Sequence, residues 1–167
     1  MQNIEEMLKD YYKKQKRIEY LKGRYTVLGD NIREIMQCIS ETRHTLEIIL
    51  PAQRYDLERV STSKTRTSPQ EEALLDSERR MELKIRELQR DQQDSLIERY
   101  ELEGECERFS NMILALEDDE RTICEMKYRY KRSLTFIGYE VNADRRTISR
   151  RIQNIHDKFS EELGHIA

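Results

Sequence analysis

Hydrophobic residues recur every seven positions along the first fifty residues of the chain. One row begins at Ile4 and ends at Leu46, and a second, mostly apolar row follows it three residues later. This spacing is typical of helices that pack side by side in a coiled coil. It predicts helices over about Asn3–Lys22 and Asn31–Ile48 within an N-terminal coiled-coil segment of residues 1–50.

A few residues indicate where these two helices end. Gly23 and Gly29 interrupt the apolar rows, and Asp30 is suited to cap a new helix, although the two helices could also be continuous. Pro51 is expected to end the second helix, because proline lacks the amide hydrogen that a helix interior uses.

The next twenty residues have a different composition. The stretch Tyr55–Pro69 is dense in serine and threonine and carries Arg59, Lys64 and Arg66. Such a segment has little to bury, which predicts a mobile loop over residues 51–70. The loop is either a plain linker or a basic arm that contacts phosphates or a partner.

A third helical pattern follows the loop. Apolar residues at seven-residue intervals run from Leu74 to Leu116 and predict a long acidic helix over residues 71–110, with a candidate break at Gly104. A helix of roughly 35–40 residues is more than ~50 Å long. It therefore has to pack on the first two helices, on a second copy of the chain, or on both.

Composition supports an all-α fold, and the charge is unevenly distributed. Charged residues make up 38% of the chain and hydrophobic residues 37%, which suits helices that bury one stripe. Glu71 to Glu120 hold 17 acidic and 7 basic residues, a net charge of −10, whereas Arg121 to Lys158 hold 10 basic and 4 acidic residues, a net charge of +6. The basic segment is expected to face a polyanion.

Residues 111–167 contain short apolar patterns that precede a tight turn. Ile123, Met126 and Tyr130 are expected to form the buried face of a first helix, and Ser133 is suited to cap a short second helix. The apolar residues of that second helix are Phe136, Ile137 and Val141.

A last helix is expected after a turn at Asn142 and Ala143. Asparagine tolerates a left-handed backbone, and Asp144 is suited to cap the helix that follows. The apolar residues of this helix recur at helical spacing: Ile148, Ile152, Ile155 and Phe159. The sequence thus predicts an all-α chain in which an elongated coiled-coil segment precedes a C-terminal helix-turn-helix domain.

The outer face of the last helix carries residues that can read DNA, because its first turns would enter the major groove. These residues are Arg145, Arg146, Ser149, Arg150 and Gln153. The first helix of the domain supplies cations suited to phosphate contacts, namely Lys127, Arg129, Lys131 and Arg132. Tyr128 and Tyr130 are expected to be packing residues, and a merely solvated basic helix is the alternative interpretation.

Other functional classes find little support. The chain has no phosphate-binding glycine motif, zinc-protease motif or metal-spaced Cys/His set, so we predict no enzyme, metal or other cofactor. Cys38, Cys106 and Cys124 are odd in number and widely spaced, which indicates reduced, buried thiols. No apolar run approaches the ~20 residues that span a bilayer. We therefore expect a soluble cytoplasmic protein without membrane contact.

The stretch FIGYEVNADRRTISRRIQNIHDKF resembles the fourth-region helix-turn-helix of bacterial sigma-70-type factors. Ile137 falls at the family's apolar position in the first helix, Asn142 at its turn and Thr147 at its recurring Thr-Val step. Gly138 departs from the usual alanine and is expected to loosen the short helix slightly. The wider chain is similar to phage late-gene regulators of the ArpU/RinA type, which join N-terminal helices, a comparable loop, a long helix and a sigma-like module.

This resemblance implies a phage or prophage transcription activator that binds double-stranded DNA upstream of late or packaging genes and engages host RNA polymerase. The residues of the last helix expected at the DNA are Arg145, Arg146, Thr147, Ser149, Arg150 and Gln153. The coiled-coil helices would make the protein a homodimer or small homo-oligomer on repeated half-sites in the host nucleoid.

Three alternatives stay open at this point. A complete sigma factor would need a promoter-melting module, hinted at only by the basic and aromatic residues of Tyr11–Arg17. A small terminase subunit would join a helix-turn-helix to helices that form a ring of many copies. A coiled-coil adaptor would use the basic end to bind an acidic protein.

Overall fold

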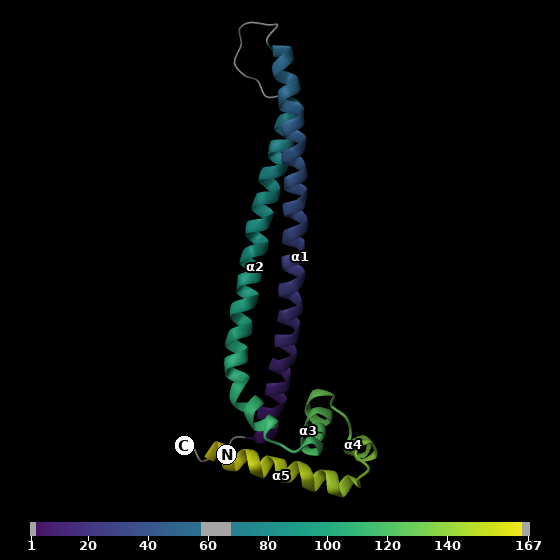
Figure 1. Ribbon diagram of the computed structural model, residues 1–167. Helices are drawn as coiled ribbons and strands as arrows, with labels where there is room; N and C mark the ends of the chain where they lie inside the picture. Colours follow the sequence, from purple (N-terminus) through teal and green to yellow (C-terminus); the bar gives the residue numbers. More distant parts are fainter. Residues whose placement is uncertain (1–2, 58–67, 165–167) are drawn as a thin grey trace. The chain divides into compact units, whose positions relative to one another are not determined.

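The chain is all-α in its computed structural model, which describes residues 3–57 and 68–164, without the side chains of 49–57. The elements are α1 (Ile4–Leu57), α2 (Pro69–Leu114), α3 (Asp118–Cys124), a π-helical turn η1 (Glu125–Arg129), α4 (Leu134–Glu140) and α5 (Arg145–Gly164) (Figure 1). These two ranges contain no strand, so the expected all-α class is confirmed.

The helix α1 is continuous over 54 residues. Of the two alternatives that the sequence left open at Gly23–Asp30, the structure shows the continuous helix: the apolar row continues, and Leu28 and Ile32 are buried just beyond the first glycine. A glycine inside a helix costs only about 1 kcal/mol, less than the burial of two large aliphatic side chains contributes.

The expected end of this helix at Pro51 is wrong, since α1 runs through Pro51 to Leu57. Proline removes one hydrogen bond from a helix, and a long helix can continue past it. Of the loop expected over residues 51–70, residues 51–57 and 69–70 are therefore helical, which corrects its bounds, and residues 58–67 lie outside the described residues.

The start of α2 is fixed by a reciprocal pair of hydrogen bonds. The amide of Glu71 donates to Ser68 Oγ (3.2 Å), and the amide of Ser68 donates to a carboxylate oxygen of Glu71 (3.4 Å). Pro69 suits the first helical position, where its missing N–H would have no partner. The helix runs for 46 residues to Leu114, past the expected end and without a break at Gly104.

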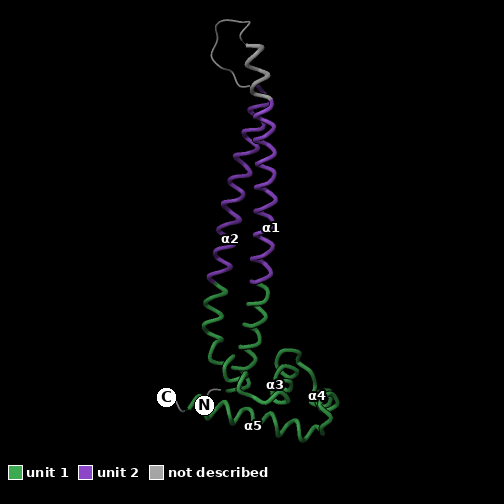
Figure 2. The backbone as a smooth tube through the Cα atoms, in the orientation of Figure 1, with its two compact units in different colours: residues 1–20, 98–167 green, residues 21–97 purple. Residues whose placement is uncertain are grey.

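The chain forms two compact units, and each contains part of α1 and part of α2 (Figure 2). Unit 1 comprises residues 1–20 and 98–167, and unit 2 comprises residues 21–97. The first twenty residues therefore belong to the same unit as the C-terminal helices, whereas the sequence placed them in a coiled-coil segment of residues 1–50.

In unit 2, α1 and α2 run side by side in opposite directions (Figure 2). Leu28, Ile32 and Leu88 form a buried core, and Ile35 and Ile85 pack against it. The seven-residue rows thus produce the packing of paired helices that they predict.

Polar contacts also join the two helices of unit 2. Arg43 pairs with Glu78 at 2.5 Å and with Glu82 at 3.1 Å. The side-chain amide of Gln92 donates to the backbone carbonyl of Tyr25 (3.1 Å). Exposed ion pairs of this kind contribute little stability each, so the apolar core holds the pair together and these contacts help to set its register.

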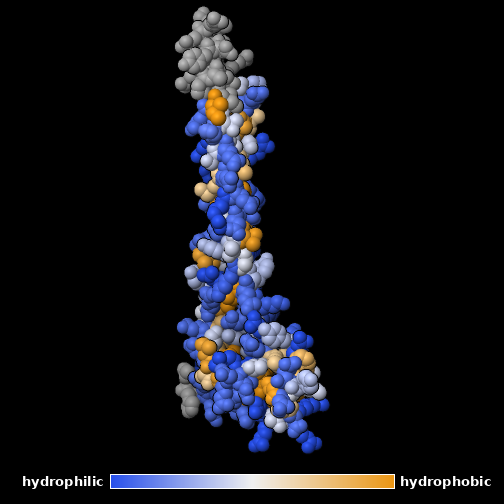
Figure 3. Space-filling view, turned by 45° about the vertical axis from the view of Figure 1, so that its right-hand side comes forward, coloured by the Kyte–Doolittle hydropathy of each residue, from blue (hydrophilic) through white to orange (hydrophobic). Residues whose placement is uncertain are grey.

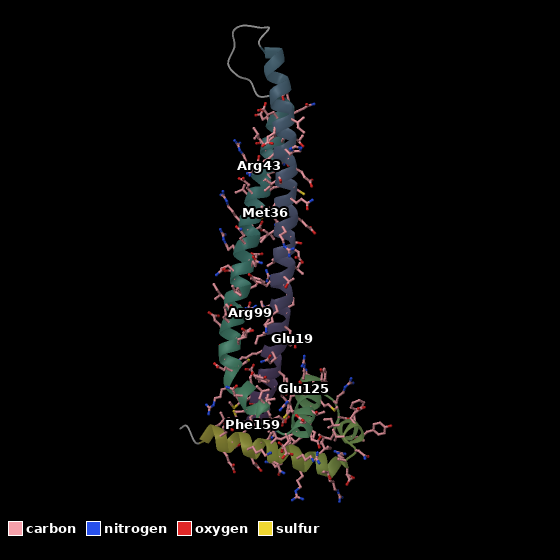
Figure 4. The ribbon with its side chains drawn as sticks, in the orientation of Figure 1. Glu19, Met36, Arg43, Arg99, Glu125 and Phe159 are labelled. Atoms are coloured by element: carbon pink, nitrogen blue, oxygen red, sulfur yellow. The ribbon has the colours of Figure 1, made fainter. Side chains whose placement is uncertain are left out.

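Unit 1 has a larger core, drawn from four parts of the chain. The N-terminal end of α1, the C-terminal end of α2, the α3–η1 segment and the second half of α5 all contribute to it. Its buried members are Ile4, Leu8, Tyr12, Met112, Ile113, Leu116, Cys124, Tyr128, Ile155 and Phe159. Figure 4 shows Phe159 where α5 passes the ends of α1 and α2. The second half of α5 is thereby anchored on the long helices.

The face shown in Figure 3 is mostly hydrophilic, with hydrophobic side chains exposed singly or in small groups. Within residues 3–57 and 68–164, no helix combines the length and the apolar composition that crossing a bilayer requires.

Candidate nucleic-acid interface

The C-terminal helices of unit 1 form the expected helix-turn-helix. The amide of Phe136 donates to Ser133 Oγ (3.2 Å), which confirms Ser133 as the cap of α4. Asn142 has φ 51° and lies in the left-handed region, as the turn requires. The amide of Ala143 donates to the carbonyl of Gly138 (2.8 Å), so the turn folds back on α4 before α5 begins.

Gly138 is required by this turn rather than merely tolerated in it. A Cβ added at Gly138 would lie 2.4 Å from the carbonyl oxygen of Ala143. That distance is far below van der Waals contact, and the opposing atom belongs to the backbone. The expectation that Gly138 only loosens α4 therefore misses its main role, which is to let the turn approach the helix closely.

A small core fixes α4 against α5. Ile123, Ile137 and Ile148 are fully buried and in contact with one another. The partly buried side chains around them are Met126, Leu134, Val141, Ala143 and Ile152. The inward row predicted for α5 is confirmed, since Ile148, Ile155 and Phe159 are buried and Ile152 is half-buried.

The outer face of α5 has the predicted composition. All six candidate residues on it are exposed: Arg145, Arg146, Thr147, Ser149, Arg150 and Gln153. Within the described residues, Arg145, Arg146 and Arg150 form no ion pair or side-chain hydrogen bond. The side-chain amide of Gln153 donates to Asp157 one turn later (3.0 Å). The first two turns of α5 thus carry three arginines that can bind a partner.

The cations on the opposite edge of α5 are neutralised inside unit 1. Arg151 pairs with Asp119 at 3.3 Å, and Lys158 pairs with Glu120 at 2.6 Å. Both acids belong to the first turn of α3, which lies against α5 (Figure 1). The unpaired arginines of α5 consequently lie in its first two turns, apart from the edge that pairs with α3.

The segment before α4 differs from the expected straight helix. In η1 the amide of Tyr130 donates to the carbonyl of Glu125, five residues earlier (3.0 Å). This wider turn rotates the residues that follow it, as a π-helical insertion does. Tyr128 is buried as a result, whereas Tyr130, expected in the core, is 54% exposed. The assignment of Tyr130 to the core is therefore wrong.

Tyr128 connects this turn to α5. Its hydroxyl lies 2.7 Å from His156 Nε2, at hydrogen-bonding distance. Burial raises the pKa of Tyr128, so the phenol stays protonated, and burial lowers the pKa of His156. Both groups are thus neutral near pH 7, as suits a hydrogen bond at the edge of a core.

The four cations expected at phosphates have different surroundings. Arg129 pairs with Glu19 at 2.7 Å and with Glu125 at 3.5 Å, and Figure 4 shows these two glutamates close together. Lys127 is half-buried. Lys131 is exposed, with a left-handed φ of 53°, and the guanidinium of Arg132 lies 5.0 Å from the Phe136 ring centre.

The structure therefore places the six candidates of α5 on one exposed face, whereas these four cations differ from one another in exposure and pairing. They come from η1 and from the connection between η1 and α4. Arg129 is in addition held by two carboxylates of its own chain. We keep Lys131 and Arg132 as the better candidates for phosphate contacts, because neither is paired within the described residues.

Sequence reasoning missed the support that α1 gives this domain. Ile4, Leu8 and Tyr12 pack in the same core as Ile155 and Phe159 of α5. The apolar row at the start of the chain signals a buried face, but no local signal shows which distant helix covers it.

Cysteine and metal chemistry add nothing to the candidate interface. All three cysteines are free thiols; Cys106 and Cys124 are buried as predicted, but the prediction is wrong for Cys38, which is exposed. Burial raises the pKa of Cys124 to about 12. In the part of the chain that the structure describes, no three His, Cys, Asp or Glu side chains are arranged to hold a metal ion.

No protein-family model matches this chain, and neither a curated protein nor a solved structure shows significant similarity to it.

Proposed function

We propose that this protein binds double-stranded DNA in a sequence-specific manner through the first half of α5. The observation that carries the proposal is the set of exposed, unpaired cations Arg145, Arg146 and Arg150 at the start of a helix that follows a tight turn. In a helix-turn-helix, the first turns of that helix enter the major groove, where arginine pairs with guanine.

The charge of α5 supports binding through one half of the helix only. Its last two turns carry Asp157, Glu161 and Glu162, which would repel a phosphate backbone. The same half supplies Ile155 and Phe159 to the core of unit 1. The first half of α5 thus faces the DNA, and the second half anchors the helix in the core of unit 1.

The resemblance to ArpU/RinA-type regulators extends the proposal from DNA binding to gene regulation. We propose a phage or prophage activator of late genes that acts on the nucleoid in the bacterial cytoplasm and contacts host RNA polymerase in a sigma-like manner. Paired recognition domains in a homodimer or small homo-oligomer would then occupy repeated half-sites.

Selection from a pool of random-sequence duplexes tests the proposal. The wild-type protein is expected to enrich one sequence motif, and the R145A/R150A variant is expected to lose it. The variant R79A, which removes an exposed arginine from α2, is the matched control and should select the wild-type motif. Each base-pairing arginine should account for about 1–3 kcal/mol of discrimination.

Two results would overturn the proposal. Enrichment of no motif, together with no salt-dependent binding to any duplex, would favour the adaptor that binds an acidic protein. A motif that the R145A/R150A variant still selects would mean that another surface reads the DNA.

A further inference from the structure

A shallow hollow lies beside the turn between α4 and α5. The polar side chains around it are Thr135, Tyr139, Glu140, Asn142, Asp144 and Arg145. Gly138 lies at the same hollow, where the backbone carbonyl of Ala143 approaches it too closely for any side chain. The hollow therefore joins the outer side of α4 to the first residue of the candidate recognition helix.

Tyr139 is the aromatic residue that lines this hollow. It is 85% exposed, and its side chain makes no hydrogen bond or ring contact within the described residues. Thr135 lies one helical turn before it on the same face of α4 and is also exposed. Two hydroxyl groups thus stand on one face of α4, next to an unpaired arginine.

This arrangement rests on the backbone of the turn. The close approach of Gly138 to the Ala143 carbonyl and the left-handed Asn142 set α4 and the start of α5 side by side. When the first turns of α5 enter a major groove, the helix before it crosses the sugar-phosphate backbone that borders the groove. The hydroxyls of α4 would then face phosphate oxygens.

We propose that Tyr139 donates a hydrogen bond to a phosphate of the duplex that α5 reads, and that Thr135 and Arg145 border the same contact. This inference rests on the proposed DNA binding and adds to it a positioning residue on α4. Contacts of this type fix the register of the protein on the duplex without reading its sequence.

The charges around the hollow determine how strongly it attracts a phosphate. Glu140 and Asp144 contribute two negative charges against the single positive charge of Arg145. The hollow by itself therefore does not attract a phosphate, which is brought there by the cations of α5. The contact of Tyr139 should add affinity through a hydrogen bond from an uncharged donor, with no counterion released.

Two substitutions at exposed positions test the inference in opposite directions. Y139F removes only the hydroxyl and is expected to weaken binding about tenfold, both to the duplex enriched by the wild type and to a shuffled duplex of equal length. Its salt dependence should match the wild type. E140Q removes a carboxylate from the rim and should strengthen binding to both duplexes.

The results separate this inference from the proposed function. If the wild type binds and selects DNA but Y139F and E140Q bind both duplexes as the wild type does, the inference is wrong and the proposed function stands. A loss confined to the enriched duplex would make Tyr139 a base-reading residue and would also overturn the phosphate assignment. If the wild type binds no duplex, both proposals fail.

Discussion

Single residues decide whether the candidate recognition helix is presented correctly. Ser133 caps the start of α4, and Asn142 turns the chain in the left-handed backbone conformation that most residues avoid. Gly138 has the strictest requirement of the three, because the opposing atom is a backbone oxygen that cannot move without disturbing α5.

The variant G138A is expected to lower the free energy of unfolding by about 1–3 kcal/mol, the usual cost of forcing an extra methyl group into a packed site. Helix propensity alone would favour alanine, so the loss has to come from the contact with Ala143. Urea unfolding measures the change.

The variant G23A provides a control of the same chemistry. An added Cβ at Gly23 meets no atom within 4 Å, so this substitution is expected to stabilise α1 by about 0.5–1 kcal/mol. Equal or greater stability of G138A relative to the wild type would contradict the close approach of the turn.

At the scale of elements, the π-helical turn and α5 depend on each other. The turn buries Tyr128, and Tyr128 reaches His156 in the middle of α5. Acidic residues of α3 pair with Arg151 and Lys158 on the adjacent edge of the same helix. The polar side chains on one side of α5 thus find partners in neighbouring elements, and its outer face remains free for a partner.

The burial of His156 predicts that the free energy of unfolding depends on pH. Burial, the largest cause, lowers the pKa of His156 in the folded protein, while the carboxylates of Glu5 and Asp157 oppose the shift. The unfolded chain then binds a proton more readily than the folded one as the pH falls through about 6.5. The free energy of unfolding should therefore decrease between roughly pH 7 and pH 5.

The variant H156Q, which cannot titrate, should have a flatter stability curve across this range, measured by urea unfolding at successive pH values. H44Q removes an exposed histidine from α1 and should keep the wild-type slope. A slope in H156Q as steep as in the wild type would show that other groups cause the pH dependence.

At the scale of the whole molecule, the DNA-binding candidate is larger than the C-terminal fifty residues. Residues 1–20 and 98–114 complete the core on which the second half of α5 packs. Leu8 is fully buried in that core although it lies far from α5 in the sequence. A destabilising substitution at the start of the chain should therefore also destabilise the candidate recognition helix.

The variant L8A is expected to cost about 2–5 kcal/mol of stability and to reduce the protection of the α5 amides from hydrogen exchange. I32A makes a comparable cavity in unit 2 and should reduce protection there while affecting α5 much less. Unchanged protection of α5 in L8A would mean that the helix-turn-helix is stable without α1.

The sequence by itself determined the helical class, the inward row of α5, the cap at Ser133 and the turn at Asn142, because each depends on a local period or on the conformational preference of one residue. The sequence also indicated which residues of α5 face outward, since an amphipathic helix with one buried stripe leaves little choice for the rest.

Only the tertiary structure decided the features that depend on distant contacts. Helix α1 continues past Gly23 because the long-range packing of Leu28 and Ile32 outweighs a local penalty. The π-helical turn buries Tyr128 but leaves Tyr130 exposed, which no regular period can anticipate. The pairing of Arg129 with Glu19, the need for glycine at position 138 and the packing of Leu8 in the core beneath α5 all arise when segments remote in the sequence meet in space.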